Sequence, residues 1–166
     1  MGTARGLPAA LFPTGQIAGL LYAHDVDHRW LAKATELLWS RLDGSAALDP
    51  YELRGVLTFL DHVRDHERAE KAFDRLAPKL LDVVTFDPDA PGEVHGPLDF
   101  APLPDSIARR VFDDDTIAAH LDHLVSAQQP DGGWTFNWPV WSPAAAADWR
   151  GSVTVDALVV LRANGR

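Results

Sequence analysis

The chain has 166 residues, 46% of them hydrophobic and 23% charged, and it contains no cysteine. This length suits one domain with a self-sufficient core, and the missing thiols exclude a disulfide framework, a thiolate metal site and a cysteine nucleophile. The formal net charge of −9 argues against nucleic-acid binding, which requires a basic surface. Because no apolar run approaches about 20 residues and residues 1–10 lack a secretory-signal pattern, we expect a soluble, cytoplasmic protein without a membrane span.

Apolar residues recur at helical spacing in six segments, and no segment alternates with period two. The first of these stripes consists of Ile17, Leu20, Leu21 and His24. Successive helices are expected to pair as three hairpins, which join 15–24 with 28–42, 50–62 with 66–80, and 114–129 with 152–164. The pattern predicts an all-α protein, with residues 1–166 forming a single domain of α/α-hairpin repeats.

Helix start and stop signals support these boundaries. Asp49, followed by Pro50 and Glu52, is typical of a capped helix start. Asp27 and Asp65 can cap the second helices of their hairpins, and the acidic run 113–115 opens the fifth helix. The last helix is expected to begin at a Ser152 cap and to end before Gly165.

The first two hairpins look like copies of each other. Residues 24–28 and 62–66 both read His-x-x-Asp-His, at an offset of 38 residues, and periods near 40 with two helices each are typical of helical repeat proteins. Between the second and third hairpins, a connection at about 82–105 contains five prolines and is predicted to be irregular. Its apolar residues indicate that it packs over the helices.

The most distinctive segment is Gln128-Gln129-Pro130-Asp131-Gly132-Gly133-Trp134. Its glycines suit a tight turn, Asp131 can bind the turn backbone, and Trp134 can fold back onto the helix end. The segment resembles the Asp-Gly-Gly-Trp turn of the α/α-toroid families, which include class II terpene cyclases and prenyltransferase β-subunits. It is also similar to compact actinobacterial prenyltransferase-like proteins.

The resemblance implies a partial α/α toroid, since three hairpins could close only half a ring. Either the half-ring stands alone or two chains complete it, and we expect a homodimer. The chain departs from the family's chemistry: Phe112 stands where the cyclase Asp-x-Asp-Asp motif needs its first aspartate, the magnesium-binding Asp-Asp-x-x-Asp motif is absent, and no cysteine is present for zinc. In these families the turn itself is structural, so the resemblance bears on fold more than on function.

Large aromatic side chains are the main candidates for substrate binding. These candidates are Tyr22, Trp134, Trp138, Trp141 and Trp149. The four tryptophans lie within or directly before the segment Thr135–Arg150, which is expected to be rich in loops. Buried tryptophans can simply supply core, and the alternative is an aromatic-lined cavity for an apolar or cationic ligand. Asp148 is the candidate acid in such a cavity, and a surface contact between Asp148 and Arg150 is the alternative.

His24 and His62 are the other candidate catalytic residues. Each ends a predicted helix, where a partly positive side chain suits the helix dipole, and a proton-transfer role is the functional alternative. Zinc binding is a third interpretation, but the histidines of each pair are expected on different helices. No resident metal or cofactor is predicted.

Two functions of different classes follow from these features. The first is a terpene cyclase- or prenyltransferase-like protein that binds, and in the enzymatic interpretation transforms, a hydrophobic isoprenoid-like small molecule by acid–base side chains. The alternative is a non-catalytic helical-repeat protein that docks a partner on a concave face. A third interpretation is a metal-dependent hydrolase that uses the paired histidines.

Overall fold

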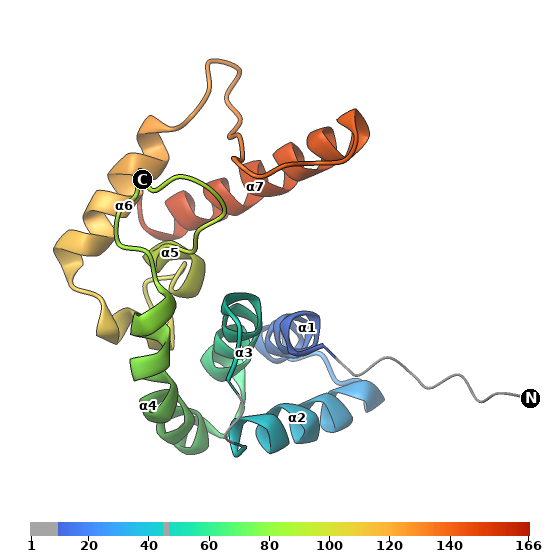
Figure 1. The fold of residues 1–166 in the computed structure, drawn as a ribbon. Coiled ribbons are helices and arrows are strands. Elements are labelled where there is room, and N and C mark those ends of the chain that lie inside the picture. Colours follow the sequence, from blue (N-terminus) through green and yellow to red (C-terminus); the bar gives the residue numbers. More distant parts are fainter. Residues whose placement is uncertain (1–9, 45–46) are drawn as a thin grey trace, which may run out of the picture. The chain divides into compact units, whose positions relative to one another are not determined.

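The computed structural model describes residues 10–44 and 47–166 (Figure 1). All regular secondary structure in these two ranges is helical, so the predicted all-α class is confirmed. The elements are α1 (Leu11–Ala23), α2 (Arg29–Leu42), α3 (Pro50–His62), α4 (His66–Val83), α5 (Pro97–Phe100), the 3-10 helix η1 (Ile107–Val111), α6 (Asp114–Ser126) and α7 (Pro143–Ala163).

The described residues group into two compact units, one that ends at Leu76 and one that comprises Ala77–Arg166, and the boundary falls within α4. In the first unit α1 contacts α2, and in the second α6 contacts α7, so the first and third predicted helix pairs do pack together. The second predicted pair is wrong in this respect, because α3 packs chiefly on α1 and makes no comparable contact with α4. The closure of such pairs into a toroid stays a prediction, as does the single domain.

The first unit is built on an unusually close crossing of α1 and α3, which lie side by side in Figure 1. Gly15 and Gly19 of α1 face the backbone of α3, and a Cβ at either position would fall within 3.0 Å of Gly55 or Thr58 backbone atoms. Gly55 faces the backbone of Phe12 in the same way. The missing side chains therefore allow the two backbones to approach each other.

This crossing corrects the buried face predicted for the first helix. The buried residues of α1 are Leu11, Gly15, Ala18 and Gly19. Ile17 and Leu20 are about half exposed, at 49% and 53%, and His24 is also exposed. The apolar stripe was the wrong face because the close approach of the α1 and α3 backbones requires small residues on the contacting side of α1.

Local capping determines several helix starts as expected. Asp49 and Glu52 form a reciprocal capping box at α3, with Asp49 accepting a hydrogen bond of 2.8 Å from the Glu52 amide. Asp65 accepts from the Arg68 amide at α4. At α2 the predicted Asp27 cap is wrong, because His28 is the extended residue before the helix and its Nδ1 accepts from the Trp30 amide.

The proline-rich connection packs onto the second unit, as predicted. Helix α4 continues to Val83, and the Thr85 amide then donates to the His95 carbonyl, which closes a loop. Phe100 of the short helix α5 is 1% exposed, and α5 contacts α6. The buried His120 of α6 holds the loop from the other side through a 3.0 Å hydrogen bond between its Nε2 and the Phe86 carbonyl.

Arg109 ties this connection to the end of α7. Its Nε donates to the Ala101 carbonyl at 2.8 Å, and its Nη2 donates to Asn164 Oδ1 at 2.7 Å. Asn164 in turn donates to the Pro102 carbonyl. Burial lowers the pKa of Arg109, an effect partly opposed by the negative charge of Asp114.

Helix α7 begins earlier than its sequence pattern indicates. Its N-cap is Ser142, whose Oγ accepts from the Ala145 amide at 3.1 Å, and Pro143 occupies the first helical position. The Ser152 cap is therefore wrong, and the irregular part of Thr135–Arg150 is limited to 135–142. The predicted stop at Gly165 is confirmed by its φ of 70° and by the Arg166 amide, which donates back to the Leu161 carbonyl.

Candidate functional site

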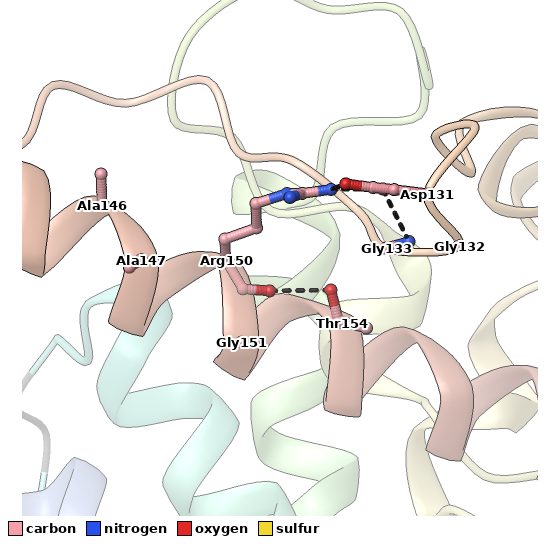
Figure 2. A pocket seen from close by; sticks show the side chains of 8 residues that line it. All are labelled: Asp131, Gly132, Gly133, Ala146, Ala147, Arg150, Gly151 and Thr154. Carbon is pink, nitrogen blue, oxygen red and sulfur yellow. Dashed lines mark hydrogen bonds and ion pairs between the residues drawn. The ribbon is translucent and has the colours of Figure 1, made fainter.

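The turn after α6 has the structure that its residues predict. The Gly132 amide donates to the Gln129 carbonyl, and the Gln129 amide donates to the Gly133 carbonyl, each at 2.8 Å. Gly132 has a φ of 86°, a conformation that favours glycine. The Gly133 amide donates to Asp131 Oδ1 at 3.2 Å (Figure 2). The segment is thus a closed, self-bonded turn.

Trp134 joins this turn to both helices of the pair. Its ring is 4% exposed, and its Nε1 donates to the Leu124 carbonyl of α6 at 2.7 Å. Its backbone amide donates to Thr154 Oγ1 of α7 at 3.0 Å. The predicted fold-back of Trp134 onto the helix end is therefore confirmed, and the indole N–H satisfies a carbonyl that the end of α6 leaves without an intrahelical partner.

A second link between the turn and α7 is the ion pair of Asp131 and Arg150. Arg150 Nη2 lies 2.5 Å from Asp131 Oδ1 and 2.6 Å from Oδ2. The Arg150 side chain extends past Gly133 toward Asp131 (Figure 2). A Cβ added at Gly133 would lie 3.0 Å from Arg150 Nη2. Arg150 thus pairs with Asp131 and not with Asp148, the contact that the sequence suggested. The interaction could be recognised only once α7 was known to begin before Arg150.

An open hollow of about 590 Å³ lies over this ion pair. Its walls are Asp131, Gly132, Gly133, Ala146, Ala147, Arg150, Gly151 and Thr154 (Figure 2). None of the tryptophans lines it. Because the walls consist of glycines, alanines, one threonine and an arginine–aspartate pair already matched internally, this hollow does not provide the aromatic lining that the sequence predicted for a ligand site.

Loss of the ion pair should change the pKa of Asp131. The Arg150 hydrogen bond, followed by that of the Gly133 amide, lowers the pKa of Asp131, whereas the Thr116 amide lowers the pKa of Asp113. In the variant Arg150→Gln, the pKa of Asp131 should rise toward its ordinary value while that of Asp113 stays low. Carboxyl-carbon NMR titration measures both groups in one sample. An unchanged pKa at Asp131 would contradict the geometry.

The lowered pKa of Asp131 also makes the free energy of unfolding depend on pH. A carboxyl whose pKa is lower in the folded state than in the unfolded state stabilises the fold above its unfolded pKa. That contribution disappears as the pH falls through the lowered pKa of Asp131. The stability difference between the native chain and Arg150→Gln should therefore narrow on acidification below the ordinary aspartate range.

Two of the predicted tryptophans meet in an aromatic cluster, which we define as Phe136, Trp138 and Trp149. The Trp138 and Trp149 rings pack edge to face with centroids 5.4 Å apart, and Phe136 lies 4.8 Å from Trp138. Trp149 comes from α7 and the other two from the connection before it. Trp149 is 42% exposed and Trp138 is intermediate, so the cluster is partly open to solvent. Trp141, at 86% exposure, projects into solvent.

The other candidate site residues are placed as follows. Tyr22 is partly buried in the first unit, where its hydroxyl and Thr35 Oγ1 share a hydrogen bond of 2.8 Å and its ring lies 6.3 Å from that of Phe59. His24 is the exposed residue after α1, and His62 is the last residue of α3. Asp148 is exposed on α7. These three residues belong to two different units, and their catalytic roles stay predictions.

Among the residues that the structure describes, no group of three or more His, Asp or Glu side chains is arranged to hold a metal ion. No helix of the described ranges is long and apolar enough to cross a membrane. Comparison of the chain with protein-family models, with curated proteins and with solved structures finds no match in any of the three. The resemblance to the toroid families therefore continues to depend on the turn at 128–134.

Proposed function

We propose that the protein binds an uncharged, isoprenoid-like apolar molecule at the cluster of Phe136, Trp138 and Trp149. The observation that carries this proposal is the edge-to-face pair of Trp138 and Trp149, two rings that remain partly accessible to solvent. Aromatic faces offer a large apolar area and also attract cationic groups. A hydrocarbon chain that covers these rings removes apolar surface from water on both molecules.

The charges around the cluster favour an uncharged ligand over an isoprenoid diphosphate. The chain carries a formal net charge of −9, which repels anions over the surface as a whole. Arg150, which follows Trp149 in the sequence, already has its charge balanced by Asp131. A diphosphate would have to compete with that carboxylate for the guanidinium. We therefore expect an isoprenoid alcohol or hydrocarbon to bind more tightly than its diphosphate.

The resemblance of the turn at 128–134 to that of the toroid families supports the same ligand class. In the enzymatic version of the proposal, Asp148 is the acid, because it adjoins Trp149 in the sequence. The aromatic pair supports binding directly, whereas catalysis depends in addition on Asp148.

Titration of the full chain with farnesol, followed by calorimetry, tests the binding claim. We expect saturable binding that Trp138→Ala and Trp149→Ala each weaken about tenfold, because each removes one ring of the contact. Trp141→Ala is the matched control: it removes an equally large ring from the same segment, but one that is already 86% exposed, and should alter the affinity much less.

Farnesyl diphosphate as a second titrant tests the charge argument and should bind more weakly than farnesol. Absence of farnesol binding, or equal losses in all three tryptophan variants, would contradict the proposal. Absence of binding is also what the alternative of partner docking on a concave face predicts. A product formed from the ligand and lost in Asp148→Asn would extend the proposal to catalysis.

A further inference from the structure

Helix α7 presents a second apolar face that the second unit does not use. Ala157 and Leu161 are its buried residues. Val155, Leu158 and Val159 lie at spacings of three and four on another side of the helix and are 59%, 50% and 53% exposed. An exposed apolar stripe of this kind on a long helix indicates a contact surface rather than a solvated one.

Two residues of opposite charge lie at equal distances from Val155 along this face. Asp148 lies seven residues before Val155 and Arg162 seven residues after it, which is about two helical turns in each direction. All three therefore share one side of the helix, and both charged residues are exposed. One end of the stripe is negative and the other is positive.

We propose that this face binds the same face of a second copy, with the two α7 helices antiparallel and Val155 on the two-fold axis. In this register, Asp148 faces Arg162 of the partner subunit and Arg162 faces the partner subunit's Asp148. The contact is isologous and closes at two chains. It does not depend on the ligand proposed for the aromatic cluster, but it engages Asp148 with Arg162 of the partner subunit and so replaces the role of that carboxylate as an acid.

The shape of the face fits the same register. Gly151 lies four residues before Val155, and Val159 lies four residues after it. The two-fold axis therefore sets Gly151 against Val159 of the partner subunit. A Cβ at Gly151 would have no heavy atom within 4 Å, so this position is an open gap in the helix surface. The branched side chain of valine can enter that gap, as a knob enters a hole between packed helices.

The charge pattern favours a second copy in this orientation over other occupants. Asp148 and Arg162 are separated by about 21 Å along one helix, so they cannot pair with each other within a chain. Parallel copies would set like charges opposite one another, which is unfavourable. Antiparallel copies match every charge of the stripe with its opposite, and complementary charge of this kind selects orientation and partner.

Sedimentation equilibrium of the full chain, over about a hundredfold range of concentration, tests the register through charge reversal. The native chain should be a dimer. Asp148→Arg and Arg162→Asp should each raise the dimer dissociation constant about tenfold, because each sets like charges together at both ends of the contact. The double variant Asp148→Arg/Arg162→Asp should restore dimerisation. A monomeric native chain, or a double variant as weak as the single ones, would overturn the proposal.

Cysteine cross-linking tests the axis independently, because the native chain contains no cysteine. Val155→Cys should oxidise to a disulfide-linked dimer, since the two copies of residue 155 meet on the axis. Ala144→Cys is the matched control: residue 144 is exposed and lies on the same side of α7, but eleven residues from the axis. It should not cross-link in an antiparallel pair. Cross-linking at residue 144 but not at 155 would overturn the antiparallel register.

Discussion

Adding one methyl group at Gly15 should destabilise the N-terminal unit by about 2–3 kcal/mol, the upper part of the range for overpacking. The new Cβ of Gly15→Ala would fall on the Gly55 carbonyl of α3, and backbone atoms cannot turn aside as a flexible side chain can. Helix α1 would have to move away from α3 along its whole contact. The gain in intrinsic helix propensity from glycine to alanine, about 1 kcal/mol, opposes this cost but does not cancel it. Urea unfolding followed by far-UV circular dichroism measures the difference.

Leu20→Ala is the control that separates the two interpretations of α1. Leu20 belongs to the apolar stripe seen in the sequence, yet it is 53% exposed. Its truncation should cost less than about 1 kcal/mol, because much of the side chain already contacts water. If Leu20→Ala were more damaging than Gly15→Ala, the stripe and not the glycine face would be the buried side of the helix.

Trp134→Ala should cost the C-terminal unit about 3–5 kcal/mol, the usual range for removing a large buried aromatic ring. The ring is 4% exposed, so truncation leaves a cavity between the turn and the two helices. It also leaves the Leu124 carbonyl without the indole donor. Thermal or urea unfolding of the full chain measures the loss.

Two further variants separate the contributions of the Trp134 ring. Trp134→Phe keeps most of the apolar volume but loses the hydrogen bond to Leu124, and should cost about 1–2 kcal/mol. Trp141→Ala removes a ring that is 86% exposed and should change stability by no more than about 0.5 kcal/mol. Equal effects of the substitutions at residues 134 and 141 would contradict the conclusion that Trp134 holds the turn to both helices.

The capped helix starts and the turn at 128–134 were predictable because their determinants lie within a few residues of one another. Asp49 and Glu52 satisfy each other's backbone amides across one helical turn. Asp131, Gly132 and Gly133 likewise bind and bend their own segment. The exception at α2, where His28 replaces Asp27 as the cap, is also local: two neighbouring residues can both accept, and the sequence does not say which one leaves the helix.

The candidate site was only partly predictable, because the residues that form it are not near neighbours in the sequence. Four tryptophans between residues 134 and 149 identified an aromatic region, yet one is core, two form a partly open pair and one projects into solvent. The early start of α7 brings Trp149 onto a helix that faces Trp138. Arg109 gave no signal in the sequence, and for Arg150 the sequence suggested only its neighbour Asp148 as a partner. The partners that these arginines bind lie far from them along the chain, 55 residues away for Arg109 and Asn164 and 19 for Arg150 and Asp131.

The sequence by itself determined that this protein is helical, where most of its helices begin and end, and how the Asp-Gly-Gly-Trp turn bends. These properties depend on periodicity and on hydrogen bonds between near neighbours. Tertiary structure decided which face of α1 is buried, which aromatic rings meet and which carboxylate Arg150 binds. Each of those outcomes depends on the shape of a second element: a glycine face is favourable only where another backbone fits against it, and a charged side chain pairs with the partner that the fold brings within reach.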